Sequence, residues 1–299
     1  MKLNCVILNY NDARTTAGLV RRIRDYDILD GIVVVDNRST DDSMKRLEAL
    51  RDEKVTVIGT ERNGGYGYGN NRGVRYAAGK NGATHVLIAN PDVNVSERCV
   101  CAMLQIFAGH SEVGVVSARM RDEMYGDLKN AWPSRTFSGE LLAMGPISRR
   151  LFRGILEYPV SYMNGKQAVY VDTVHGSLLM VDVAKFLQCG GYDEHMFLYQ
   201  EESVLAWRMR KHGFRTVLIR NHSYRHAHSV SISKSFSGQM ERQKLRERSV
   251  MYYLSRYLQI GFAGKLFTKI WFLIIRAEIR TAEVFDKVAV QLQGNLNER

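Results

Sequence analysis

The sequence predicts an α/β protein with a mostly parallel sheet flanked by helices, followed by a C-terminal helical extension. In residues 3–97, short apolar runs typical of buried strands alternate with amphipathic runs typical of helices. After about residue 238 the sequence becomes basic, aromatic and helical in pattern. We therefore expect an α/β domain over residues 1–235 and a basic, aromatic helical region over residues 236–299.

The first part of the chain is expected to consist of strands joined by helices. Strands are expected at residues 3–10, 31–37, 54–60 and 86–89. Helices are expected at residues 15–26, after a cap at Ser39 or Thr40, and between a glycine-rich loop at 63–73 and about residue 78. In such sheets ligands bind at the carboxyl ends of the strands, where Asp36, the glycine-rich loop and Asp92 fall.

The remainder of the expected domain is less regular. Residues 117–170 show no clear period and end in a stretch, 167–182, typical of strand, turn and strand. A helix is expected near residues 200–212 and a further strand at 214–219.

Composition narrows the class of protein. The chain has 299 residues, 45% of them hydrophobic, and a net charge of +11, which suggests an anionic partner such as a nucleotide, a lipid headgroup or nucleic acid. Its four cysteines include no CxxC pair, and the first residues lack the apolar run of a signal peptide. No stretch approaches the roughly 20 apolar residues of a spanning helix. We expect a cytoplasmic protein.

The stretch "THVLIANPDVNVSE" places a carboxylate directly after a run that should be buried. A strand at residues 86–89 ends in Asn90, Pro91 and Asp92, with no cationic residue nearby in the sequence. Such a carboxylate is costly unless a cation or hydrogen-bond donors meet it. Asp92 is therefore a candidate ligand-binding residue; the alternative is that Asn90, Pro91 and Asp92 form an ordinary turn.

Two further stretches at strand ends allow two interpretations each. The glycines of "ERNGGYGYGNNRG", residues 61–73, could let backbone approach a ligand or could belong to a flexible surface loop. Their spacing and position do not fit a dinucleotide fingerprint. Asp36 could accept hydrogen bonds from a ribose or a base, or could stabilise the turn that follows it.

Paired acids and clustered histidines lie further along the chain. Glu201 and Glu202 begin a helix, where acids are favoured by the dipole; alternatively, one of them is a general base at the edge of an apolar pocket. His226 and His228, at i and i+2 of an extended segment, point to one side and can offer a metal ligand.

In their order along the chain, these motifs resemble the family 2 glycosyltransferases of GT-A fold, in particular the rhamnosyltransferase-like branch of bacterial surface-polysaccharide enzymes. The resemblance covers about residues 3–235. It rests on these stretches: "VILNYN", "VVVDNRSTDDS", "RNGGYGYGNNRG", "LIANPDV", "GGYDEHMFLYQEE", "WRMRKHGF" and "HAHS".

The resemblance implies a role for each candidate residue. Asp92 corresponds to the family's metal motif and would bind Mg²⁺ or Mn²⁺, with His226 or His228 completing the site. Glu202 stands at the position of the catalytic base, with Glu201 beside it as the alternative. The resemblance also implies a group of donor-binding residues: Asn9, Asp36, Asn63, Gly65, Asn71, Arg72 and Asn90. Two departures from the family pattern are Asn90 in place of an acid and Val204 in place of a second acid.

The implied reaction is an inverting, metal-dependent transfer of a sugar, such as rhamnose, from a nucleotide diphosphate donor. The implied acceptor is a saccharide or a lipid-linked saccharide in polysaccharide biosynthesis, and no nucleic acid partner is expected. Two alternatives belong to other classes. One is a non-catalytic sugar-nucleotide or polysaccharide-binding protein on the same fold. The other is a nucleotidyltransferase, which would be expected to carry an early lysine-containing phosphate loop that this sequence lacks.

The basic tail also allows two interpretations. Six consecutive apolar residues at 270–275 lie between Lys265, Lys269, Arg276 and Arg280, and six residues of helix rise only about 9 Å, too little to span a bilayer. The helix could lie at an anionic membrane surface, on the inner face of the cytoplasmic membrane. Alternatively, the apolar residues at 266, 267, 270, 273, 274 and 277 could form a core stripe against the catalytic domain or in a homo-oligomer.

Overall fold

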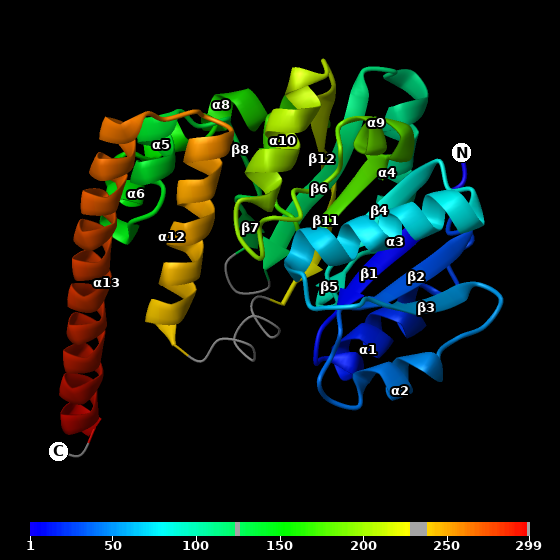
Figure 1. Cartoon of the computed structure of the whole chain (residues 1–299), viewed down its shortest axis with the longest axis horizontal. Helices are drawn as coiled ribbons and strands as arrows, with labels where there is room; N and C mark the ends of the chain where they lie inside the picture. The colour runs from blue at the N-terminus through cyan, green and yellow to red at the C-terminus, as the bar shows by residue number, and fades with distance from the viewer. Residues whose placement is uncertain (123–125, 228–237, 298–299) are drawn as a thin grey trace. The chain divides into compact units, whose positions relative to one another are not determined.

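The computed structural model describes residues 1–122, 126–227 and 238–297 (Figure 1). The chain divides into two compact units. Unit 1 consists of residues 1–134 and 159–237, and unit 2 consists of residues 135–158 and 238–299. The segment 135–158, which the sequence-based division left in the α/β domain, is therefore grouped with the helical tail.

Unit 1 is built on a central sheet with the strand order β3-β2-β1-β4-β11-β6-β12-β5. The first four strands of this order run parallel, as expected from the alternation of strands and helices. β11 runs antiparallel to both β4 and β6, and β12 runs parallel to β6. The strands of this path are β1 (Leu3–Asn9), β2 (Gly31–Asp36), β3 (Val55–Gly59), β4 (His85–Ala89), β5 (Val93–Asn94), β6 (Val113–Asp122), β11 (Leu178–Asp182) and β12 (Arg215–His226).

Short strands extend this framework. β7 (Gly126–Leu128) pairs with β6 and β9 (Ala168–Val171) pairs with β12, while β8 (Ala131–Trp132) and β10 (Thr173–Val174) form a separate pair. The stretch expected to be strand, turn and strand thus contains β9, β10 and β11.

Helices cover both faces of the sheet because side chains alternate along each strand. Leu3, Cys5 and Ile7 of β1 belong to a core shared with α1 (Ala13–Ile23), α2 (Ser43–Glu48) and α4 (Glu97–Gly109). Val6 and Leu8 point to the other face, where α3 (Gly65–Asn81) packs. The remaining helices of unit 1 are α8 (Val160–Met163), α9 (Val183–Gln188) and α10 (Glu201–Lys211).

The glycine-rich stretch is helical in the structure, so the expectation of a loop over residues 63–73 is wrong. Helix α3 already begins at Gly65. A Cβ on Gly69 would lie 2.2 Å from Leu8 Cδ1, and one on Gly73 would lie 2.4 Å from Val6 Cγ1. These glycines allow the helix to approach the sheet closely, a packing requirement that outweighs their low helix propensity.

Strand β12 runs further than the predicted strand at 214–219 and ends at His226. Its pairing with β6 shifts register between Ile219 and Ser223, and its last residues pair with β5. His226 stands opposite Val93 in that pairing. The extra length therefore brings a histidine from late in the chain to the segment that follows Asp92.

Unit 2 is helical and is held by polar contacts as well as by apolar packing. It contains α5 (Phe137–Leu142), α6 (Pro146–Leu151), α7 (Arg153–Leu156), α12 (Gln239–Arg256) and α13 (Phe262–Asn297). Arg246 of α12 donates to the carbonyls of Ala143 and Met144, and Trp271 of α13 donates to the carbonyl of Leu141. These donors satisfy carbonyls at the end of α5 that the helix itself leaves unpaired.

No helix in the described part of the chain combines the length and the apolar character needed to cross a membrane.

Candidate active site

The structure brings Asp92 and His226 together. Oδ1 of Asp92 lies 3.1 Å from Nε2 of His226, and both side chains are more than nine-tenths buried. Two backbone elements set this distance: the β5–β12 pairing, and a hydrogen bond from the amide of Ala227 to the carbonyl of Asp92. His228, the alternative metal ligand, lies outside the described residues.

The Asp92 and His226 side chains suit a divalent cation that is also held by a substrate. Carboxylate oxygen suits Mg²⁺ and Mn²⁺, and imidazole nitrogen suits transition metals better than Mg²⁺. Within the described ranges, no group of three or more His, Cys, Asp and Glu side chains is placed to hold a metal ion. Two protein ligands leave the other coordination positions to phosphate oxygens and water, which fits a metal that binds together with a nucleotide diphosphate.

The segment 175–177 connects the Asp92–His226 pair to the paired acids. The ring of His175 lies 5.6 Å from that of His226, measured between centroids, and the carbonyl of Ser177 accepts a hydrogen bond from the amide of Asn90. The amide of Gly176 donates to Oε1 of Glu202 over 3.1 Å. Sequence reasoning did not select these residues; the available signal was a small, polar turn, His-Gly-Ser, directly before a strand.

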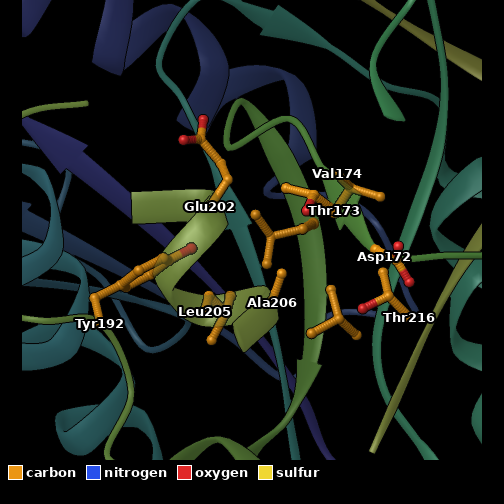
Figure 2. Close-up of a pocket in the computed structure, with 10 residues that line it drawn as sticks. Asp172, Thr173, Val174, Tyr192, Glu202, Leu205, Ala206 and Thr216 are labelled. Atoms are coloured by element: carbon orange, nitrogen blue, oxygen red, sulfur yellow. The ribbon is translucent and has the colours of Figure 1, made fainter. Parts of the chain in front are cut away.

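Glu202 lies at the edge of a small cavity (Figure 2). In this view its carboxylate projects from the first turn of α10 and points away from Leu205 and Ala206, which lie deeper on the same helix. Half of the residues that line the cavity are apolar and half carry a hydroxyl or a carboxylate: Val115, Asp172, Thr173, Val174, Leu179, Tyr192, Glu202, Leu205, Ala206 and Thr216. Glu202 is half-buried, so its carboxylate can reach a bound molecule.

Glu201 has the opposite environment. Its side chain is buried, with 4% of the residue exposed, and Oε1 has no hydrogen-bond partner among the described residues. Burial, reinforced by the charge of Glu202, raises the pKa of Glu201 to about 8. Burial also raises the pKa of the neighbouring Tyr66, with further contributions from Tyr192 and the two glutamates. Of the two acids, Glu202 is therefore the more accessible.

Asp36 and Asn9 form a hydrogen-bonded unit where β1 and β2 end. Asp36 accepts from the Asn9 side chain over 2.8 Å and from the amide of Ser39 over 3.0 Å, and the Ser39 hydroxyl donates to it over 2.5 Å. The carbonyl oxygen of the Asn9 side chain accepts from Thr16. These contacts hold the turn after β2. Only 3% of Asp36 is exposed, so a nucleoside would touch no more than the exposed edge of the carboxylate.

Asn63 and Gly65 are joined through a residue that sequence reasoning missed, Asn37. The buried side chain of Asn37 donates to Oδ1 of Asn63 over 2.9 Å and to the carbonyl of Gly65 over 3.1 Å. Gly65 has a φ of 87°, and a Cβ there would lie 2.0 Å from the carbonyl oxygen of Phe197. The start of α3 is therefore packed against the segment that leads to Glu201 and Glu202.

Asn71 and Arg72 face different surroundings although they are adjacent. Asn71 is buried; it donates to the carbonyl of Tyr192 and to Glu194, and it accepts from the amide of Tyr192. It thereby ties residues 192–194 to α3. Arg72 is more accessible, bonds Glu61 over 3.1 Å and lies over the ring of Tyr68. Of the two, Arg72 is the more accessible side chain.

Comparison with known proteins identifies the family to which this chain belongs. Residues 5–175, more than half of the chain, match the model of glycosyl transferase family 2. The chain belongs to this family, and the family predicted from the sequence is confirmed.

Two characterised relatives share part of their length with this chain. One is the low-salt glycan biosynthesis hexosyltransferase Agl10 of Haloferax volcanii, 27% identical over 209 residues, which cover 70% of this chain and 62% of the relative. The other is the N-acetylglucosaminyl-diphospho-decaprenol L-rhamnosyltransferase of Mycobacterium tuberculosis, 28% identical over 214 residues, or 67% of each protein. The chain thus spans less than two thirds of the Haloferax relative.

Solved structures support the fold. The mannosyltransferase PcManGT of Pyrobaculum calidifontis, in complex with GDP-Man and Mn²⁺, matches with a TM-score of 0.60 over 98% of this chain and 79% of its own. At 15% identity this likeness shows the fold alone. The chain is a family 2 glycosyltransferase of GT-A fold, as the sequence predicted.

Proposed function

We propose that this protein transfers a sugar, with inversion, from a nucleotide diphosphate donor to a hydroxyl of a saccharide or lipid-linked saccharide. The observation that carries the proposal is the meeting of Asp92 and His226, 3.1 Å apart, at the end of the sheet where Asn90 and Gly176 connect them to Glu202. Family membership supports the reaction class.

Asp92 and His226 are the residues that would hold Mg²⁺ or Mn²⁺. When bound, the ion would neutralise the negative charge that develops on the leaving diphosphate. Asn90 and Arg72 would bind the donor, with Arg72 supplying an accessible cation near the middle of α3. Asn9, Asp36, Asn63, Gly65 and Asn71 would shape the donor site by holding the turn after β2, the start of α3 and the segment 192–194.

Glu202 would act as the general base. Its carboxylate is fixed at one oxygen by the amide of Gly176 and lies at the edge of the cavity, so it can accept the proton of an acceptor hydroxyl as that oxygen attacks the sugar. The bond from the sugar to the diphosphate breaks on the opposite face, which inverts the anomeric centre. Positive charge accumulates on the sugar ring in such a transition state, so the placement of nearby carboxylates also matters.

Rhamnose is the donor sugar we propose to test first, as its deoxythymidine diphosphate. This choice rests on the similarity to the mycobacterial L-rhamnosyltransferase. The name of that relative also motivates a lipid-linked acceptor, and with it a cytoplasmic protein that acts at the inner face of the membrane.

The test is a transfer assay with purified full-length protein, Mn²⁺, a panel of nucleotide sugars and saccharide acceptors. We expect release of nucleoside diphosphate that depends on the acceptor, and a product whose anomeric configuration, determined by NMR, is opposite to that of the donor. Donor binding or slow donor hydrolysis without transfer to any acceptor would favour the non-catalytic binding protein. A retained configuration would exclude the single displacement.

A further inference from the structure

Exposed large apolar side chains are concentrated in unit 2. Among the described residues, 14 large hydrophobic side chains are exposed, and 10 of them belong to unit 2, which is much the smaller unit. Those 10 lie on α6, on α7 or the residue before it, and on α13: Ile147, Leu151, Phe152, Ile155, Phe262, Leu266, Phe267, Ile270, Leu273 and Ile274. We call this set the apolar face of unit 2. Exposed apolar patches of this kind mark interaction sites.

The face on α13 is separate from the packed side of the helix. Thr268, Phe272, Ile275 and Ile279 recur at spacings of three and four residues and are buried. Leu266, Ile270 and Leu273 point the other way and are 50% to 62% exposed. The residues of the stripe expected at 266, 267, 270, 273, 274 and 277 are exposed, so the packing within unit 2 does not bury them. Packing of this stripe on the catalytic domain or on a second copy stays a prediction.

Helices α6 and α7 also carry large apolar side chains that are exposed. Ile147, Leu151 and Ile155 are 58% to 74% exposed, and α6 packs on α13 within unit 2 (Figure 1). The amide of Ile147 donates to Glu278 of α13. The ring of Phe267 also lies 6.2 Å from that of Phe137 on α5, between centroids. The exposed residues of α6 and α13 thus belong to neighbouring helices.

Cations accompany the apolar side chains on these helices. Lys265, Lys269 and Arg280 are exposed on α13. Arg149, Arg150 and Arg153 are exposed on α6 and α7. Arg153 pairs with Glu157 at 2.7 Å. Among the described acids of unit 2, Glu247 and Glu140 are buried and Glu157 pairs with Arg153. Glu241 is exposed and Glu278 half-buried, so the exposed cations named above outnumber the accessible acids.

We infer that the apolar face of unit 2 binds the surface of an anionic membrane, with the apolar side chains at the boundary of the headgroups and acyl chains. Apolar side chains with neighbouring lysines and arginines are typical of helices that lie in a membrane interface. Charge favours a membrane over a second copy of this chain, because a symmetric dimer would bring the same unneutralised cations together. Anionic headgroups would neutralise them.

The inference deepens the proposed function, since it supplies a surface from which a lipid-linked acceptor could be reached, but its test uses neither donor nor acceptor. Full-length protein is sedimented with vesicles of phosphatidylcholine alone or with phosphatidylglycerol added, at low and high salt. We expect binding to the anionic vesicles at low salt, weaker binding at high salt and little binding to the neutral vesicles.

Two double variants and two matched controls identify the surface. K265Q/K269Q should weaken binding to anionic vesicles roughly 25-fold, since each cation near the surface contributes about a five-fold change. I270S/L273S should weaken it at least roughly ten-fold through lost apolar contact. The controls are K45Q/K80Q, with the same change in charge, and L187S, which alters an exposed leucine of unit 1; both should bind as wild type does.

Circular dichroism and nucleotide binding establish that each variant is folded. Absence of binding to anionic vesicles at low salt would overturn the inference, as would equal losses in the unit 2 variants and their controls. A dimer in analytical ultracentrifugation that I270S/L273S abolishes, without vesicle binding, would assign the face to a second copy instead. Failure of the transfer assay alone would leave the membrane inference standing.

Discussion

The carboxylate of Asp92 and the imidazole of His226 lie 3.1 Å apart, although they come from distant parts of the sequence. One follows β4, and the other ends β12, so the pair exists only because β12 extends past its register shift to pair with β5. This makes the pair a sensitive test of the proposed donor site.

Asp92→Ala and His226→Ala should each abolish the part of nucleoside diphosphate binding that depends on Mn²⁺. Loss of groups that merely support a metal ligand costs roughly 10- to 100-fold in affinity, so loss of a direct ligand should cost at least as much. Calorimetric titration with and without Mn²⁺ measures this effect. Asp25→Ala and His110→Ala, at exposed positions, are the controls, and unchanged Mn²⁺ dependence in the Asp92 variant would remove that residue from the metal site.

Glu202→Gln should leave donor affinity unchanged and lower the rate of transfer by roughly 10²-fold or more, because the amide cannot accept the acceptor proton. Glu201→Gln should have a smaller effect, since that side chain is buried away from substrate. Transfer rates at saturating donor compare the two variants. The opposite ranking would reverse the assignment of the base.

Glu201 should also give stability a distinctive pH dependence. Because its pKa is raised from 4.5 to about 8 in the folded protein, the folded state holds a proton that the unfolded state loses between these values. Stability from this residue is complete below about pH 4.5 and falls as pH rises toward 8. We expect the melting temperature of wild type, relative to Glu201→Gln, to fall from pH 5 to pH 8; a constant difference would mean that the carboxylate is charged throughout.

Gly73→Ala should destabilise the protein, whereas Gly79→Ala in the same helix should not. A Cβ at position 73 would lie 2.4 Å from Val6 and 2.9 Å from Val35. Apart from the backbone of α3 itself, no atom of the described residues lies within 4 Å of a Cβ at position 79. We expect a loss of about 1–3 kcal/mol for Gly73→Ala and a gain of up to about 1 kcal/mol for Gly79→Ala, both measured by denaturant unfolding. Equal effects would mean that α3 does not approach the sheet this closely.

Asn71→Ala separates positioning from direct donor binding. Its buried amide makes three hydrogen bonds to residues 192–194, so the variant should lose about 1–3 kcal/mol of unfolding free energy. We expect donor affinity to fall less than in Arg72→Ala, which removes an accessible cation at little cost in stability. A stable Asn71→Ala protein that fails to bind donor would make Asn71 a contact residue.

The sequence was sufficient to predict the alternating strands and helices because each has its own apolar period, and the acids at strand ends followed from that pattern. It could not show that Asn71 and Asn63 bond the chain itself, since a buried amide and a ligand-binding amide look alike in sequence. The glycines of α3 were misread for a related reason. Their purpose is close contact with Val6 and Leu8, which only the tertiary structure reveals.

The bridge at residues 175–177 was missed because its contribution is largely through backbone groups. The Gly176 amide meets Glu202 and the Ser177 carbonyl meets Asn90, and such groups carry no side-chain signature. The buried state of Glu201 was equally hidden, because adjacent glutamates at a helix start read as two dipole-stabilising acids. Left-handed backbone at Tyr199 and Gln200, immediately before them, shapes the entry into this helix.

Unit 2 is built from two stretches that lie far apart in the sequence, and this affects whether the C-terminal stretch could be transferred to another protein by itself. Arg246 and Trp271 donate to the carbonyls of Leu141, Ala143 and Met144, which lie in the stretch inserted within unit 1. A recombination event that moved residues 238–299 onto another enzyme would leave those donors without acceptors and would expose the apolar side of α5 and α6. Transfer of the tail alone would therefore lose these contacts within unit 2, whereas transfer of both stretches would keep them.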